Sequence, residues 1–360
     1  MLLKWLDSTQ STKQTMKDNN SIRVAVVGAA GRTGRMFAFE LAKAADVLGI
    51  VRKEEIETIG EQGLWVRRKG EEPRQLRIKL ISEDRFSCSF LPQVVFLTTK
   101  NPVGPAVGYY YQKIKNMEKL PCLVLSQNGL SAGKEAKEAL ERVLGERAKE
   151  VQVVRVSLLN PVEREKAGGR QCVAYFLPVR LAFGVFSGKK DVGLLSSLFK
   201  RASIRAKEIE PARVPDMEVS KLFLNLIGMA SSSWGVSLKK GFEEKRIAEE
   251  EFLCLKEYIR VVKAAGRGFI NLPGIPLKLL AFLLDKLPLS FLLLFRKKIG
   301  SIVSRARGEK EKGNIDEIDY YQGEVVRLGK RAGIPTPIQE RILKRIRQRL
   351  NRFRVGCRSG

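Results

Sequence analysis

Three glycines near the start of the chain have a spacing that suits the binding of a phosphate-bearing ligand. Gly28, Gly31 and Gly34 follow a short apolar run, residues 22–27, that is typical of a buried parallel strand. Apolar residues at helical spacing follow, so the glycines occupy a strand-to-helix turn. Backbone N–H groups and the helix dipole attract anions at such turns, which bind pyrophosphate in dinucleotide-binding domains. The GxxGxxG pattern departs from GxGxxG, so a purely structural turn remains the alternative.

Position 52 lies where the second strand of such a unit ends, and its residue type bears on the cofactor. An acidic residue there hydrogen-bonds the ribose 2′-hydroxyl of NAD, whereas a basic residue accommodates the 2′-phosphate of NADP. Arg52 therefore favours NADP. Glu54 and Glu55 follow directly and could compete for its guanidinium, and the simplest alternative is that Arg52 is one of 66 basic residues on a charged surface.

The composition limits the chemistry that the side chains can perform. The 360 residues contain no histidine, which excludes imidazole-based catalysis and histidine-ligated metal sites, and we expect no metal. A proton donor must then be Lys, Glu, Asp, Tyr or Cys. Five scattered cysteines without a CxxC pair favour a reducing, cytoplasmic setting. The net charge of +27 predicts attraction to anions, including nucleotides, phosphorylated metabolites, membranes and nucleic acids.

Alternating strand and helix patterns predict a doubly wound α/β domain in the first half of the chain. Strands are expected at residues 46–51, 94–98, 120–126 and 151–159. Lys100 and Gln127-Asn128-Gly129 come just after two of them, at the edge where open α/β sheets bind ligands. Residues 67–77 are charged and loop-like, whereas two later apolar runs, 173–176 and 179–183, suggest antiparallel strands.

Strand signals fade near residues 205–216, after which helical periodicity dominates. We therefore predict four parts: a flexible extension at 1–20, a Rossmann-type NADP-binding domain at 21–210, a helical domain at 211–350, and a basic tail at 351–360. The first twenty residues lack the apolar segment of a secretory signal. The basic C-terminal segment is more typical of a solvated helix than of a nucleic-acid arm, so no specific nucleic-acid partner is expected.

The most apolar stretch of the chain is residues 276–295. Lys278, Asp285, Lys286 and Pro288 interrupt it, which argues against a transmembrane helix. A pair of short buried helices is the favoured interpretation. An interfacial or partner-binding segment is the alternative, and the basic residues at 296–298 would suit it.

Three separated segments resemble those of one enzyme family. Lys221 and Asn225 belong to KLFLN, and Glu317 begins EIDYYQGEVVRLGKRAGIPTP. Together with QNG at 127–129 and the glycine turn, this order resembles the ketopantoate reductase (2-dehydropantoate 2-reductase) family. The resemblance covers about residues 22–343. It implies an N-terminal Rossmann-type domain and an all-helical C-terminal domain like that of 6-phosphogluconate dehydrogenase, with the active site between them.

The resemblance also implies an activity and its residues. In that family NADPH delivers a hydride to a 2-oxo acid, by default 2-dehydropantoate, which gives (R)-pantoate for pantothenate and coenzyme A biosynthesis. Lys221 matches the general acid, Asn225 and Asn128 match substrate contacts, and Ser304, preferred to Ser301, matches the substrate serine. The implied cofactor-binding residues are Gly28, Gly31, Arg32, Thr33, Gly34, Arg52, Lys100, Asn128 and Glu317.

One departure from the family pattern concerns the substrate. Met229 stands where the family has an asparagine, and the run Ser231-Ser232-Ser233 is a candidate replacement. A same-fold reductase of another 2-oxo acid is therefore a rival hypothesis. A non-catalytic nucleotide-binding protein and a membrane- or RNA-associated interaction protein are further alternatives, and a homodimer is left open.

Overall fold

The computed structural model describes residues 21–307 and 315–356. The predicted extension at 1–20 and the end of the predicted basic tail, 357–360, lie outside the described residues.

An eight-stranded sheet forms the centre of the N-terminal half, in the order β12-β11-β8-β7-β6-β1-β2-β5. Its strands are β1 (Arg23–Val27), β2 (Asp46–Val51), β5 (Lys79–Ser82), β6 (Val94–Leu97), β7 (Cys122–Leu125), β8 (Val153–Leu158), β11 (Arg180–Ser187) and β12 (Arg205–Glu208). All neighbouring pairs run parallel except β11 and β8, which are antiparallel. The glycine turn follows β1, where the strand order changes direction.

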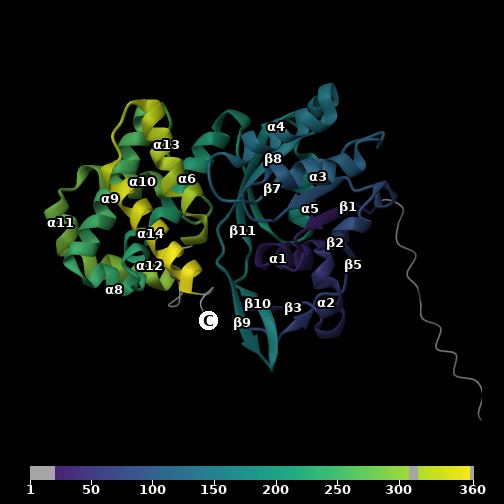
Figure 1. The fold of residues 1–360 in the computed structure, drawn as a ribbon, viewed down its shortest axis with the longest axis horizontal. Helices are drawn as coiled ribbons and strands as arrows, with labels where there is room; N and C mark the ends of the chain where they lie inside the picture. The colour runs from purple at the N-terminus through teal and green to yellow at the C-terminus, as the bar shows by residue number, and fades with distance from the viewer. Residues whose placement is uncertain (1–20, 308–314, 357–360) are drawn as a thin grey trace, which may run out of the picture.

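Helices cover both faces of this sheet (Figure 1). Val24 and Val26 of β1 pack into the core with α1 (Arg32–Leu41) and α5 (Gly193–Arg201), whereas Ala25 and Val27 pack into the core with α3 (Gly104–Ile114) and α4 (Ala132–Leu144). Successive strand residues point to opposite faces, so a strand covered on both sides must be apolar throughout. The short helix α2 (Ile56–Gln62) follows β2.

A second, four-stranded sheet contains β4 (Arg74–Gln75), β3 (Trp65–Arg68), β10 (Arg170–Tyr175) and β9 (Val162–Ala167), in that order. It was predicted only in part: the apolar run 173–176 falls largely in β10, which pairs antiparallel with β9 as expected, whereas the other three strands are charged and were missed. Several of its charges are paired: Arg68 of β3 donates to buried Glu40 at 2.9 and 3.1 Å, and Arg67 of β3 lies 2.7 Å from Glu165 of β9. Burial alone would raise the pKa of Glu40, but its hydrogen bonds hold that pKa below the usual range.

The C-terminal half is helical. Its α-helices are α6 (Val214–Leu226), α7 (Met229–Trp234), α8 (Leu238–Glu243), α9 (Lys245–Ala264), α10 (Leu277–Lys286), α11 (Leu289–Leu294), α12 (Arg296–Arg307), α13 (Gln322–Ala332) and α14 (Pro337–Gly356). The 3₁₀ helices within the described ranges are η1 (Lys53–Glu55), η2 (Glu83–Arg85), η3 (Cys88–Phe90), η4 (Gly145–Glu150), η5 (Pro211–Arg213) and η6 (Ile315–Tyr320). Most of the α-helices pack around α9, which contacts α6, α7, α8, α10, α11, α13 and α14, whereas α12 packs on α8 and α11.

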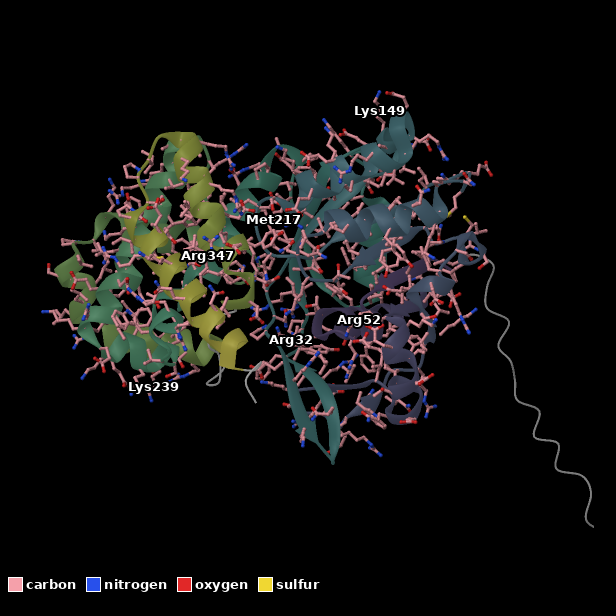
Figure 2. The ribbon with its side chains drawn as sticks, in the orientation of Figure 1. Arg32, Arg52, Lys149, Met217, Lys239 and Arg347 are labelled. Atoms are coloured by element: carbon pink, nitrogen blue, oxygen red, sulfur yellow. The ribbon has the colours of Figure 1, made fainter. Side chains whose placement is uncertain are left out.

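Helix α6 connects the two halves. It contacts β8 and β11 of the large sheet as well as α9. Figure 2 shows Met217 of α6 at the junction of the sheet and the helices. The sequence predicts one helix over 217–229, but Gly228 adopts φ +89° and divides it into α6 and α7. The apolar stretch 276–295 folds as α10 and α11, separated at Leu287-Pro288, and no helix within the described ranges is long and apolar enough to cross a membrane.

Candidate active site

The glycine turn brings the start of α1 close to the ends of β1 and β6. Gly28 has φ +80°, a left-handed conformation that favours glycine. A Cβ at Gly34 would lie 2.2 Å from the Gly28 carbonyl oxygen and 2.5 Å from Thr98 Oγ1. Thr98 Oγ1 itself donates to the Val27 carbonyl at 2.6 Å. The third glycine is therefore required for the close approach of helix to strand.

Replacing Gly34 with alanine should lower both stability and cofactor affinity, because backbone must move to admit the methyl group. We expect a loss of about 1–3 kcal/mol in unfolding free energy, the range for overpacking. Thermal unfolding, alone and with a nicotinamide dinucleotide added, measures both effects. Gly60→Ala is the matched control: Gly60 lies in α2 and nothing is within 4 Å of its Cβ position. Equal melting temperatures for the two variants would contradict the requirement for glycine at position 34.

Arg32 and Thr33 form the first turn of α1, beside the glycines. Arg32 is exposed, and in the view of Figure 2 it lies between Arg52 and the helical half. Arg52 follows β2 and is 62% exposed; its guanidinium lies 2.6 Å from Glu55 and 3.4 Å from Glu54. The hydrogen bond from Arg52 lowers the pKa of Glu55 below its usual value. Both glutamates that the sequence named as competitors thus contact Arg52.

Asn128 is the centre of a polar cluster built from three distant segments. It follows β7, and its Oδ1 accepts a hydrogen bond from Asn225 Nδ2 of α6 at 3.0 Å. Its Nδ2 donates to the Tyr321 hydroxyl at 3.0 Å and to Glu317 Oε2 at 3.4 Å. The Tyr321 hydroxyl donates to Glu317 Oε2 at 3.3 Å. We call Asn128, Asn225, Glu317 and Tyr321 the Asn128 cluster.

Two lysines that were predicted as site residues, Lys221 and Lys100, lie on elements that adjoin this cluster. Lys221 precedes Asn225 by one turn on α6, on the same side of the helix, and is half-buried. Lys100 follows β6, and its ammonium lies 3.7 Å from Asp316 of η6, with both side chains largely exposed. The sheet edge and η6 are therefore in direct contact at this point.

A buried ion pair fixes α6 against the same loop. Arg155 Nε of β8 donates to Glu218 Oε1 of α6 at 2.5 Å. Arg155 Nη2 donates to the carbonyl oxygens of Gln127 and Gly129 at 2.9 and 3.1 Å, so it contacts the residues on either side of Asn128. Sequence reasoning missed this pair and Tyr321. The available signal was an arginine inside the apolar strand pattern at 151–159.

The methionine and the serines that bear on the substrate lie in α7, which contacts η6, and in α12. Met229 is fully buried in the helical core, and the Ser231 hydroxyl donates to buried Glu251 at 2.7 Å. The serine run therefore does not take over the role of an asparagine at 229. Ser304 is buried in α12, which packs on α8, whereas Ser301 of the same helix is exposed.

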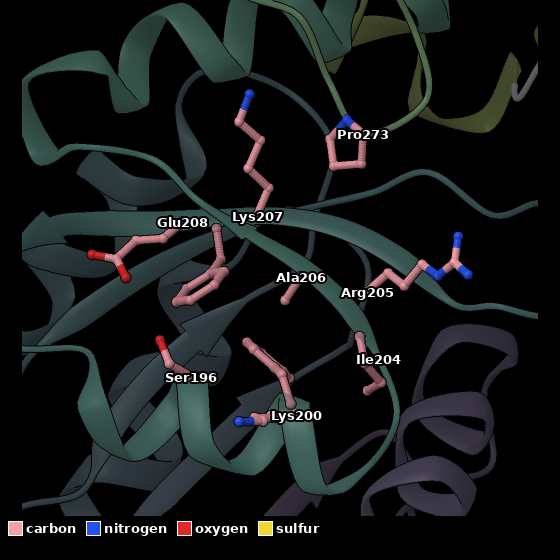
Figure 3. Close-up of a pocket in the computed structure, with 10 residues that line it drawn as sticks. Ser196, Lys200, Ile204, Arg205, Ala206, Lys207, Glu208 and Pro273 are labelled. Atoms are coloured by element: carbon pink, nitrogen blue, oxygen red, sulfur yellow. The ribbon is translucent and has the colours of Figure 1, made fainter.

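A hollow of about 590 Å³ lies at the β12 edge of the sheet. Its lining includes apolar Phe183 and Phe199 and basic Lys200, Arg205 and Lys207. Figure 3 shows the three basic side chains pointing in different directions, so they do not converge on one ligand. None of the predicted site residues lines this hollow, and the Asn128 cluster remains the candidate site.

Comparison with protein families gives two matches that together cover more than half of the chain. The model described as ketopantoate reductase PanE/ApbA matches residues 24–156. The model described as ketopantoate reductase PanE/ApbA C terminal matches residues 219–350. Asn128 lies in the first match, and Lys221, Asn225 and Glu317 lie in the second. A comparison with curated proteins gives no match.

Solved structures with the same fold cover nearly the whole chain. A PanE/ApbA family ketopantoate reductase from Ralstonia eutropha JMP134 is 16% identical with a TM-score of 0.67, over 91% of this chain and 98% of that one. A 2-dehydropantoate 2-reductase from Geobacter metallireducens GS-15 is 17% identical with a TM-score of 0.63, over 91% and 99%. A D-mandelate dehydrogenase, in a ternary structure with NADH and anilino(oxo)acetate, is 14% identical with a TM-score of 0.62, over 91% and 98%.

The large sheet covered by helices, followed by the helical half, is the predicted layout of a Rossmann-type domain with an all-helical C-terminal domain, and the comparisons confirm it. With both halves matched, the chain belongs to the ketopantoate reductase PanE/ApbA family of nicotinamide-dependent oxidoreductases.

Proposed function

We propose that this chain reduces a 2-oxo acid with NADPH, with 2-dehydropantoate as the substrate and (R)-pantoate as the product. The observation that carries the proposal is the Asn128 cluster, in which Asn225 and Glu317 of the helical half hydrogen-bond one residue at the sheet edge. We assign residues 21–210 to cofactor binding and 211–350 to the substrate. Pantothenate and coenzyme A synthesis would consume the product.

The residues between the glycine turn and Asn128 fit a nicotinamide nucleotide. The start of α1 offers free backbone N–H groups for the pyrophosphate, with Arg32 and Thr33 beside it. Near the sheet edge, Thr99 Oγ1 and Asn101 Oδ1 are buried and have no hydrogen-bond partner among the described residues. Such polar atoms suit the ribose and carboxamide end of the cofactor. When bound, NADPH supplies the hydride.

Lys221 would act on the carbonyl oxygen of the substrate. Hydride addition to a keto carbon leaves negative charge on that oxygen, and a nearby ammonium stabilises the charge as it develops. The same ammonium can deliver the proton that completes the alcohol. Asn225 and Asn128 bind each other through their amides, and a substrate hydroxyl or carboxylate entering the site would share these groups. Glu317 and Tyr321 hold the Asn128 amide in one orientation.

Arg52→Ala should weaken NADPH binding by about tenfold or more, the range for losing one hydrogen bond to a charged group, and should leave NADH binding nearly unchanged. The ion pairs of Arg52 with Glu54 and Glu55 are solvent-exposed and weak, so a phosphate can displace them. Fluorescence titration with both cofactors gives the two affinities. Lys53→Ala, at the exposed neighbouring position, is the control for general charge. Equal losses for NADPH and NADH would argue against a 2′-phosphate contact.

The burial of Met229 supports a second candidate, a reductase of the same fold for another 2-oxo acid. The family asparagine can bind a substrate only if its side chain reaches the site. Met229 is packed in the core instead, so this substrate contact is missing here. The fold shared with a D-mandelate dehydrogenase points the same way. Comparing kcat/KM for 2-dehydropantoate, a branched aliphatic 2-oxo acid and phenylglyoxylate decides between them. We expect 2-dehydropantoate to give the highest value, and a higher value for another acid would establish the second candidate.

A further inference from the structure

Helix α10 has apolar side chains on two opposite faces. Leu277, Ala281 and Leu284 are buried in the core of the helical half. Leu279 and Phe282 lie on the other side and are 54% and 57% exposed. A helix that is apolar all round is normally covered on all sides. Among the residues that the structure describes, the outer face of α10 has no such cover.

Helix α11, the next helix along the chain, also exposes apolar side chains. Phe291, Leu294 and Phe295 recur at helical spacing and are 46%, 72% and 42% exposed. The rings of Phe291 and Phe295 contact each other with centroids 5.0 Å apart. Both α10 and α11 pack on α9, and α11 also contacts α12. We call this surface the α10–α12 face; its exposed apolar residues are Leu279, Leu280, Phe282, Leu283, Phe291, Leu294, Phe295 and Ile302.

The charges on these three helices are almost all positive. Residues 276–307 contain the basic residues Lys278, Lys286, Arg296, Lys297, Lys298, Arg305 and Arg307. Asp285 is the only acidic residue in that range, and its carboxylate lies 2.7 Å from the Lys263 ammonium. Lys278, Lys286, Lys297 and Lys298 are exposed beside the apolar residues. A large exposed apolar surface bordered by lysines marks an interaction site for a partner with negative charge.

We propose that the α10–α12 face docks on an anionic membrane surface. Its short helices cannot span a bilayer, but an apolar face with flanking lysines binds at the interface, where apolar side chains enter the acyl boundary and ammonium groups meet lipid phosphates. A second copy of this chain would instead bring the same positive rim against itself, in a molecule with a net charge of +27. The charge therefore favours lipid over self-association.

Docking at this face leaves the candidate active site accessible. Figure 1 shows α11 at the end of the helical half that is farthest from the sheet, whereas α6, which carries Lys221 and Asn225, lies at the junction. The proposal therefore does not depend on the proposed reaction. It would bring the enzyme to the membrane through an end of the helical half that lies away from the sheet.

Sedimentation of the full chain with lipid vesicles tests the proposal. Vesicles of phosphatidylcholine with about one third phosphatidylglycerol should bind the protein at least about tenfold more tightly than pure phosphatidylcholine, and added salt should weaken the binding. Equal binding to both vesicles, or none to either, would overturn the proposal.

Two pairs of variants separate the apolar and charged contributions. Phe282→Ser with Leu294→Ser, and separately Lys297→Glu with Lys298→Glu, should each lower vesicle binding about tenfold or more. Leu194→Ser, at an exposed position of α5, and Lys189→Glu with Lys190→Glu, exposed on the sheet half, are the matched controls and should bind as the unchanged chain does. If the controls lose vesicle binding, or if both test variants keep it, vesicles do not bind specifically at the α10–α12 face.

Sedimentation velocity without lipid tests whether a second copy of the chain, rather than a membrane, covers the α10–α12 face. The proposal predicts a monomer or an oligomer that Phe282→Ser with Leu294→Ser leaves intact. A dimer that this double variant dissociates, together with no vesicle binding, would assign the face to a second copy of the chain. NADPH oxidation measured on the same samples shows whether the variants keep their fold and activity, so failure of docking can be told apart from failure of the proposed reaction.

Discussion

Replacing Lys221 with alanine should lower kcat for 2-oxo acid reduction by about 10²-fold or more, the range for losing a general acid. The variant loses both the cation beside the developing alkoxide and the proton that completes the product. NADPH affinity should change little, because the glycine turn and Arg52 belong to the other half of the molecule. Stopped-flow reduction with saturating NADPH gives the rate, and fluorescence titration gives the affinity.

Lys239→Ala is the matched control for this variant. Lys239 is an exposed lysine of α8 in the same helical half, and Figure 2 shows it away from the junction with the sheet. Its rate should equal that of the unchanged chain. If Lys221→Ala also reacts at the normal rate, Lys221 has no part in the chemistry.

Replacing Arg155 with methionine should cost about 3–5 kcal/mol of unfolding free energy, because Glu218 is left buried without its cation. The carbonyl oxygens of Gln127 and Gly129 lose a donor as well. Since Arg155 connects α6 to the loop that carries Asn128, kcat/KM should fall in parallel. Urea unfolding and steady-state kinetics measure the two effects.

The pH dependence of this variant has a definite sign. Burial raises the pKa of Glu218, and the attraction of Arg155 opposes that rise. Without Arg155 the folded state binds the proton more tightly than the unfolded state does, so stability falls as pH rises. The stability deficit of Arg155→Met should therefore be smaller at pH 5 than at pH 8. A deficit that does not change between these pH values would mean that Glu218 does not carry it.

Two further variants separate stability from positioning. Arg155→Met with Glu218→Met should recover most of the stability, because replacing both partners of a buried pair by apolar side chains is often neutral. Its activity should stay low, because the carbonyl oxygens on either side of Asn128 then lack the two hydrogen bonds from Arg155 that hold this loop. Arg345→Met breaks the less buried pair between α14 and Glu250 of α9 and should lower stability alone. Full activity in Arg155→Met would show that the pair positions nothing.

The sequence predicted the parts of this molecule that follow from local pattern. The apolar β-branched run before Gly28 and the three glycines determine a strand, a turn and a helix, whatever surrounds them. The charged strands β3 and β9 were missed because their charges are paired with distant residues, as Arg67 is with Glu165, 98 positions apart. Local composition carries no sign of such partners.

Some residues of the candidate site could be predicted from the sequence and others could not. Asn128, Asn225 and Glu317 were identified through segments that resemble a family, and the structure brings them together. Tyr321 and the Arg155–Glu218 pair have roles that exist only once β8, α6 and η6 are packed against one another. From residue type alone, Tyr321 would be interpreted as a surface tyrosine, and Arg155 and Glu218 as solvated charges. Contacts between distant segments are what the sequence pattern leaves out.

The most direct test of the proposed function is the oxidation of NADPH by the purified chain, followed at 340 nm after addition of 2-dehydropantoate or another 2-oxo acid. The proposal predicts steady turnover with at least one of these acids and formation of one 2-hydroxy acid per NADPH consumed. It also predicts little turnover when NADH replaces NADPH at the same concentration. Binding of NADPH without turnover on any 2-oxo acid would contradict the proposal and leave a nucleotide-binding protein that retains the fold.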